Sequence, residues 1–79
     1  MNELEKLRVL IPHWIEHNSE HADEFKRWAE KAGDAAVDIQ EASEEMAQVN
    51  LCLSAALQKL GGPLDHHHHT HDEDSFLPH

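Results

Sequence analysis

Apolar side chains recur through residues 1–61 at spacings that alternate between three and four. The first stripe, which includes two polar members, comprises Leu4, Leu7, Ile11, Trp14, Asn18, His21, Phe25, Trp28 and Ala32. The second comprises Ala35, Ile39, Ala42, Met46, Val49, Leu53, Ala56 and Leu60. This alternation is the heptad pattern of helices that pack side by side. No segment alternates apolar and polar residues as a half-buried strand does, so the pattern predicts an all-α fold.

Residues with strong capping preferences predict where two helices begin and end. Asn2, followed three residues later by Glu5, is typical of a capping box. Gly33 suits the end of the first helix, and Asp34 suits the N-cap of the second. The run 59–63, KLGGP, ends the second helix. We therefore expect an antiparallel helical hairpin. The alternative is one long helix through Gly33, which costs only about 1 kcal/mol at the glycine.

Pro12 interrupts the first stripe. A proline inside a helix removes one backbone hydrogen bond, which predicts a bend near residue 8. Because the stripe continues in phase beyond Pro12, we expect the helix to bend there and not to stop.

The chain has 79 residues and a mass of 9.0 kDa, which is at most one small domain. One hairpin cannot enclose a core, but two hairpins can, as a coiled coil or an antiparallel four-helix bundle. We therefore expect a homodimer in which residues 1–61 are the hairpin and dimerisation domain. Residues 62–79, LDHHHHTHDEDSFLPH after Gly62 and Pro63, lack an apolar period and predict a flexible, disordered tail.

Charge and cysteine content narrow the function. Sixteen acidic residues against six basic ones give a formal charge of −10, which argues against nucleic acid and against an anionic membrane surface as partners. One cysteine excludes an intramolecular disulfide. The start of the chain, MNELEKL, has no signal-peptide pattern, and no apolar run is long enough to span a membrane. The expected location is the cytoplasm.

Three histidines at four-residue spacing, His13, His17 and His21, form what we call the histidine ladder. On a straight helix its members lie about 6 Å apart along the axis and together span about 12 Å. A pair at i, i+4 can chelate one ion, whereas all three are awkward for a single ion. Either two ligands come from this helix and the others from elsewhere, or the Pro12 bend and a partner chain reshape the site.

Helical angles orient the ladder. Relative to the centre of the first stripe, His21 lies about 25° away, His17 about 65° and His13 about 105°. His13 therefore lies on the flank of the helix, and His21 lies in the apolar stripe. If the stripe packs against a second chain, imidazoles from the two chains meet there, so we expect a metal site at the dimer interface. Trp14 is expected to be a core residue that also shields the site from water. Asn18 is expected to set the register, as polar residues do in coiled coils.

A glutamate follows each ladder histidine by three residues, at Glu16, Glu20 and Glu24. A carboxylate that holds the second ring nitrogen commonly supports a metal-bound histidine, so these residues are candidates for that role. The other reading is that they are solvated helix surface, since acids are abundant in this chain.

A second histidine cluster lies in the tail, and its members, the tail histidines, are His66, His67, His68, His69 and His71. A purification tag is the alternative reading, but Thr70 interrupts the run and further residues follow it. Imidazole clusters without fixed geometry bind borderline metals. Ordering a tail costs entropy, so we expect weaker and more exchangeable binding there than at the ladder.

The known catalytic patterns are absent. Asn18 follows His17, so the general-base glutamate of a zinc protease motif is missing. The positions three before each ladder histidine are Leu10, Trp14 and Asn18, which excludes the di-iron bundle motif. Cys52, between two leucines, is expected to be a small buried hydrophobe. The sequence therefore predicts a protein that is not an enzyme.

The stretch His13-Trp14-x-x-His17-x-x-x-His21 resembles the H(W/F)-x2-H-x3-H motif of CooJ-type proteins, nickel chaperones for carbon monoxide dehydrogenase maturation. The similarity extends in outline to the helical body and the histidine-rich tail. It implies a homodimeric coiled coil with a nickel site at the dimer interface, and storage and delivery of Ni(II) by two classes of site. It further implies that His13, His17 and His21 are ligands and that Trp14 is the motif aromatic.

Two functions are consistent with these features. The first is a metallochaperone that delivers Ni(II) to a nickel enzyme or its maturation factors. The second is a metal-stabilised dimeric structural or regulatory module, such as a zinc buffer or a metal sensor. Imidazole also binds Zn(II), Co(II) and Cu(II) in vitro, and Cu(II) binds most tightly in general. Ligand chemistry therefore does not decide between the two functions.

Overall fold

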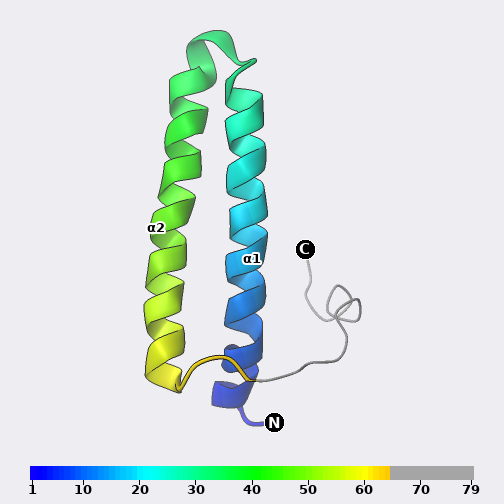
Figure 1. The fold of residues 1–79 in the computed structure, drawn as a ribbon, viewed down its shortest axis with the longest axis vertical. Helices are drawn as coiled ribbons and strands as arrows, with labels where there is room; N and C mark the ends of the chain where they lie inside the picture. The colour runs from blue at the N-terminus through cyan, green and yellow to red at the C-terminus, as the bar shows by residue number, and fades with distance from the viewer. Residues whose placement is uncertain (65–79) are drawn as a thin grey trace.

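The computed structural model describes residues 1–64, which form two antiparallel helices joined by a short turn (Figure 1). Helix α1 spans Glu3–Ala29, a short 3-10 helix η1 spans Gly33–Ala35, and α2 spans Ala36–Leu60. Within residues 1–64 there is no strand. The predicted all-α hairpin is confirmed, and the alternative of one long helix is wrong. All but the first three residues of the predicted tail lie outside the described part of the chain.

The start of α1 is the capping box that the sequence predicts. The Glu5 N–H donates to Oδ1 of Asn2 at 2.8 Å, and the Asn2 N–H donates to Oε1 of Glu5 at 3.2 Å. These bonds satisfy two of the backbone groups that a helix start leaves open. α1 then continues through Pro12 without a break, as predicted, and the bend near residue 8 stays a prediction.

The turn between the helices differs from the prediction. α1 ends at Ala29, and Gly33, at φ +59°, lies four residues farther on, in the left-handed region that favours glycine. Asp34 does not cap α2. It lies inside η1, and the N-cap of α2 is Ala35, which makes no side-chain cap bond. The 3-10 turn takes the place of a side-chain cap, because it carries the chain into α2 with helical backbone already formed.

α2 ends where the glycines predict. Gly61, at φ +108°, donates its N–H to the carbonyls of Gln58 and Leu57, and the Gly62 N–H donates to Leu57 O at 2.9 Å. These bonds close the last turn of α2 in the manner of a Schellman motif. The chain then crosses from α2 to the first half of α1 (Figure 1).

The seam between the helices follows one heptad phase in each helix. The seam holds covered or half-covered residues, which are Ile11, Ile15, Asn18, Ala22, Phe25 and Ala29 on α1, Ala32 in the turn, and Ala36, Ile39, Ser43, Met46, Asn50, Leu53, Leu57 and Leu60 on α2. The most enclosed are Ile11, Ala29, Ser43 and Leu57, at 2–8% exposed. Four of the nine predicted positions of the first stripe, Ile11, Asn18, Phe25 and Ala32, therefore lie in the seam.

The other half of each predicted stripe lies one residue away from the seam. Trp14 and Trp28 are 38% and 59% exposed, and the seam positions beside them are Ile15 and Ala29. On α2, Ala42 and Val49 are exposed, and Ser43 and Asn50 replace them in the seam. Periodicity did not separate these two phases, because apolar residues occupy both. Because Ser43 and Asn50 are polar, the pattern on α2 favoured the phase that holds Ala42 and Val49, which is wrong.

Polar contacts join the two helices in the middle of the seam. The Ser43 hydroxyl donates to Ala22 O at 2.8 Å. The Asn50 side-chain amide donates to Ile15 O at 3.2 Å, and its Oδ1 accepts from Nδ2 of Asn18 at 3.0 Å. The prediction that Asn18 lies in the seam is confirmed. Its partner, Asn50, was missed, although one asparagine in each helix was the available signal.

Candidate metal centre

The histidine ladder occupies three successive turns of α1. The helix is continuous across His13, His17 and His21, so the rings keep the predicted separation of about 6 Å per step along the axis. His13 and His17 are half-buried, and the His21 side chain is 56% exposed. The ladder is therefore presented on one intact helix.

The direction of the ladder differs from the prediction. On ideal heptad geometry, relative to the centre of the seam face of α1, His21 lies about 80° away, His17 about 130° and His13 about 180°. His13 therefore lies on the face of α1 opposite the seam and His21 lies on the flank, and none of the ladder histidines lies in the seam of the hairpin. The reason is the shift of phase described above, which turns the predicted stripe outward.

His21 lies within a second apolar stripe that the hairpin leaves uncovered. We call it the outer stripe, and it comprises Leu7, Trp14, His21 and Trp28 on α1, Ala35 at the end of η1, and Ala42, Val49 and Ala56 on α2; all are exposed except Leu7, which is half-buried. In an antiparallel pair, these equivalent heptad positions flank the seam on the same side. Trp14, Trp28 and Val49 are each more than a third exposed. Lys31 places its Nζ 5.5 Å from the Trp28 ring centroid.

The His21 ring lies between a carboxylate and an aromatic ring. Its Nδ1 is 3.7 Å from Oε1 of Glu24, and its ring centroid is 6.2 Å from that of Phe25, with 28° between the planes. The predicted carboxylate partner is thus in place for this histidine, within ion-pair distance when the ring is protonated. Glu16 and Glu20 are exposed on the same helix, and their predicted role stays a prediction.

Two residues of the sequence analysis lie elsewhere than expected. Trp14 was expected in the core and lies at the edge of the hairpin, on its outer side. Cys52 was expected to be buried and is exposed with a free thiol. Leu53 takes the seam position next to it, and one residue along a helix rotates a side chain by about 100°. The tail histidines lie outside the described residues.

Within residues 1–64 of one chain, no three His, Cys, Asp or Glu side chains are grouped so that they could hold one ion. This agrees with the span of about 12 Å along the ladder, which is too long for three nitrogens to meet at one metal. Neither helix of this part of the chain is long and apolar enough to cross a membrane.

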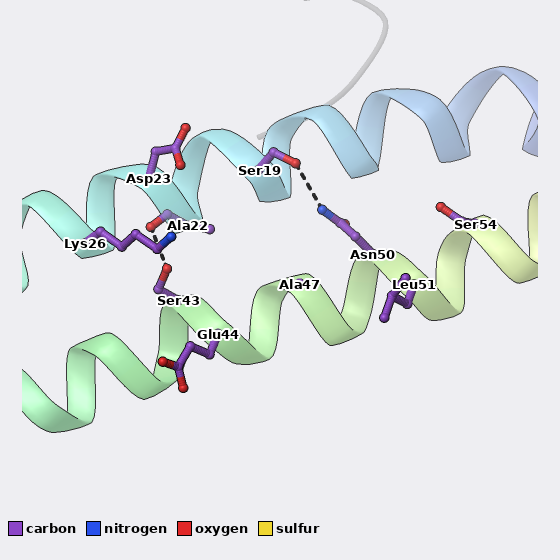
Figure 2. Close-up of a pocket in the computed structure, with 10 residues that line it drawn as sticks. All are labelled: Ser19, Ala22, Asp23, Lys26, Ser43, Glu44, Ala47, Asn50, Leu51 and Ser54. Atoms are coloured by element: carbon purple, nitrogen blue, oxygen red, sulfur yellow. Dashed lines mark hydrogen bonds between the residues drawn. The ribbon is translucent and has the colours of Figure 1, made fainter.

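The opposite side of the seam is hollowed into an open groove (Figure 2). Small and charged side chains line this groove, from Ser19, Ala22, Asp23 and Lys26 on α1 and from Ser43, Glu44, Ala47, Asn50, Leu51 and Ser54 on α2. Ser19 Oγ lies 3.1 Å from Nδ2 of Asn50, and the two side chains point toward one another across the groove. None of the ladder histidines lines the groove, so His21 and the groove lie on different sides of the seam.

Comparison with known proteins places this hairpin in a family. Residues 7–60 match the family described as Domain of unknown function (DUF8180). The chain belongs to this family. The match covers α2, all of α1 beyond its first turn, and the positions of the ladder. It ends with α2, so the tail histidines lie beyond the family's shared region.

A relative from Archaeoglobus fulgidus, named "Uncharacterized protein", is 34% identical over 62 residues, which is 73% of this chain and the whole of that protein. No solved structure matches the chain. These comparisons establish the family and assign no activity to it.

Proposed function

We propose that this protein is a nickel metallochaperone that holds Ni(II) with His13, His17 and His21 between two copies of the chain. It delivers the ion in the cytoplasm to a nickel enzyme such as carbon monoxide dehydrogenase, or to that enzyme's maturation factors. Nickel is cargo in this proposal, and the protein is not an enzyme. The tail histidines form a second, weaker class of nickel site.

One observation carries the proposal. Three imidazoles rise along α1 from its back to its outer flank, where His21 lies in the uncovered apolar stripe that also holds Trp14 and Trp28. Imidazole nitrogen suits Ni(II). A stripe of this kind is where a second hairpin would pack. Two copies related by a two-fold axis bring the same surface together, so each ladder can supply the nitrogens that the other lacks.

The resemblance to CooJ-type proteins supports the choice of nickel. The motif residues His13, Trp14, His17 and His21 lie together on one helix and inside the family's shared region. The Nδ1 of His21 lies near the Glu24 carboxylate, which would orient the ring so that Nε2 faces a metal.

Calorimetry with Ni(II) on the full-length chain tests the site. The five tail histidines are first replaced by serine, so that the ladder is measured by itself. In this background His17→Ala should weaken binding at least tenfold, about 1.4 kcal/mol, because His17 has an i, i+4 partner on both sides. His79→Ala, the same chemical change outside both clusters, is the matched control. Unchanged binding by His17→Ala would overturn the ladder as the site.

Two measurements test the rest of the proposal. Sedimentation of the metal-free protein should give about twice the chain mass of 9.0 kDa, and a folded monomer at micromolar concentration would contradict the shared site. Incubation of the nickel-loaded protein with a metal-free nickel enzyme should restore its activity. If the metal stays on the chain and Zn(II) binds more tightly than Ni(II), the protein is a metal-stabilised regulatory or structural module.

A further inference from the structure

Pro12 leaves one carbonyl of α1 without its usual donor. In an α-helix the carbonyl of residue 8 accepts from the N–H of residue 12, and Pro12, which lies inside α1, has no N–H. The Leu64 N–H donates to the Arg8 carbonyl oxygen at 3.4 Å, from beyond the end of α2. The place that a proline opens in one helix is therefore taken by the segment that follows the other helix.

The side chain of Arg8 holds the same segment. Its Nε donates to Gly62 O at 2.6 Å, and its Nη2 donates to Gly61 O at 3.1 Å. The guanidinium lies over Gly61, where an added Cβ would be 3.4 Å from Cζ of Arg8. Its positive charge faces the carbonyl end of α2, which is the negative end of the helix dipole. We call residues 61–64 the latch segment, and Arg8 with Pro12 the catch.

The backbone of the latch segment is prepared for this contact. Gly61 and Gly62, at φ +108° and +88°, lie in the region that favours glycine, and their N–H groups bond to the last turn of α2. Pro63 fixes one further torsion and has no N–H, so Leu64 is the first residue after the glycines that can donate to α1. Little chain freedom is left to lose when the segment docks.

The latch segment crosses on the groove side of the hairpin. Pro12 comes one heptad before Ser19, and Gly61 comes one heptad after Ser54. Ser19 and Ser54 both line the groove. The segment therefore spans the open end of the hairpin, opposite η1, on the side away from the outer stripe. It can dock or detach with no change at the surface where a second copy is proposed to pack.

We propose that residues 61–64 are a reversible latch that closes the open end of the hairpin, and that Pro12 and Arg8 together form its catch. The net gain from three hydrogen bonds is similar in size to the entropy cost of fixing the few residues that make them. None of the four latch residues is buried. The closed and open forms therefore lie close in free energy, and the latch opens while both helices stay folded.

Hydrogen exchange of the metal-free, full-length chain, measured by NMR, tests the latch. The Leu64 amide should exchange about 5- to 100-fold more slowly than the same amide in an unstructured peptide. It should exchange faster than the amide of Leu57, which opens only when α2 unfolds. An unprotected Leu64 amide would overturn the closed form. Equal protection of the two amides would overturn the reversible opening.

Pro12→Ala separates the catch from a general effect on stability. Alanine brings an N–H that bonds to the Arg8 carbonyl, and it is a far better helix residue than proline. The helical content, followed by circular dichroism, should stay the same or rise. The Leu64 amide should nevertheless exchange at least about threefold faster than in the parent, because its acceptor is taken. Unchanged or higher protection of Leu64 would show that Pro12 is no part of the catch.

Substitutions at Arg8 and Pro63 test the other parts. Arg8→Ala should bring the exchange of the Leu64 amide close to that of the unstructured peptide. Arg8→Lys keeps the charge without the planar fork of donors and should lose most of the protection. Pro63→Ala favours the open form through chain freedom alone and should speed exchange about two- to fivefold. Arg27→Ala removes an equal charge from an exposed position of α1 and should change nothing.

A double substitution tests whether Pro12 and Arg8 act as one catch. Arg8→Ala should speed exchange at Leu64 less in the Pro12→Ala background than in the parent, because the latch is already largely open there. Equal effects in the two backgrounds would contradict a shared catch, as would an effect of Arg27→Ala as large as that of Arg8→Ala. Nickel enters none of these measurements, so their result does not depend on the proposed function.

Discussion

The seam inside the hairpin and the outer stripe differ in which side chains they hold and in how exposed these are. Two of the four most enclosed seam residues are small, Ala29 and Ser43, at 3% and 2% exposed. The outer stripe keeps Trp14, Trp28 and Val49, which are 38%, 59% and 45% exposed. Both tryptophans thus lie on the surface that the hairpin does not cover, whereas Ile11 and Leu57 are enclosed in the seam.

This difference indicates that the two surfaces have different roles. Small residues let α1 and α2 approach closely, and the hydrogen bonds of Ser43 and Asn50 specify how they align. Full burial of a large apolar side chain is worth about 1.5–3 kcal/mol, and the hairpin leaves that free energy unused at both tryptophans. A second copy that covers the outer stripe, as proposed above, would recover it.

The largest expected effect is in the seam. Ile11→Ala removes the most enclosed large aliphatic side chain of α1, at 3% exposed. We expect the free energy of unfolding to fall by about 2–4 kcal/mol, from lost burial and from the cavity left behind. Denaturant unfolding followed by circular dichroism measures it. A loss below about 1 kcal/mol would mean that this end of the seam is not packed in solution.

Trp28→Ser tests the outer stripe. A side chain at 59% exposure contributes little to the hairpin itself, so a monomer should lose no more than about 0.5 kcal/mol of stability. If two copies meet there, the change acts twice per dimer, and the dimer dissociation constant should rise by about 30-fold or more, near 2 kcal/mol. Sedimentation at several concentrations measures this.

Val37→Ser is the matched control for that experiment. Val37 is 75% exposed on α2 and lies outside the outer stripe, so its replacement should leave the dimer unchanged. If both variants weaken association equally, the interface is not the outer stripe.

Asn50→Ala tests the polar contacts between the two helices in the seam. It leaves the half-buried amide of Asn18 without the acceptor that it now reaches at 3.0 Å. We expect a loss of about 1 kcal/mol, because an unsatisfied half-buried amide costs part of its full desolvation penalty. A double-mutant cycle with Asn18→Ala isolates the pair, and zero coupling energy would show that the contact does not stabilise the hairpin.

The smallest effect is expected at the helix start, far from either surface. Asn2→Ala removes the side-chain acceptor for the Glu5 N–H and should cost about 1 kcal/mol or less, since that turn of α1 is exposed. Thermal unfolding measures it, and Glu3→Gln, which keeps the cap, is the control. The dimer dissociation constant should not change in either variant.

Local features were predictable from the sequence because their causes lie within a few residues. The capping box of Asn2 and Glu5 and the end of α2 at Gly61 follow from backbone groups that each helix end must satisfy. The ladder on one face of α1 follows from four-residue spacing and helical geometry.

The tertiary structure decided which face of each helix turns inward. Ile15 or Trp14, Ser43 or Ala42, and Asn50 or Val49 are neighbours in sequence, and periodicity permits either phase. Close packing and cross-helix hydrogen bonds select the phase with Ser43 and Asn50 inside, because their polar groups find partners on α1 only there. The same choice turned Trp14 and His21 outward and exposed Cys52. The hydrogen bonds from the Arg8 guanidinium to the Gly61 and Gly62 carbonyls join residues more than fifty positions apart, and only the folded hairpin brings them together.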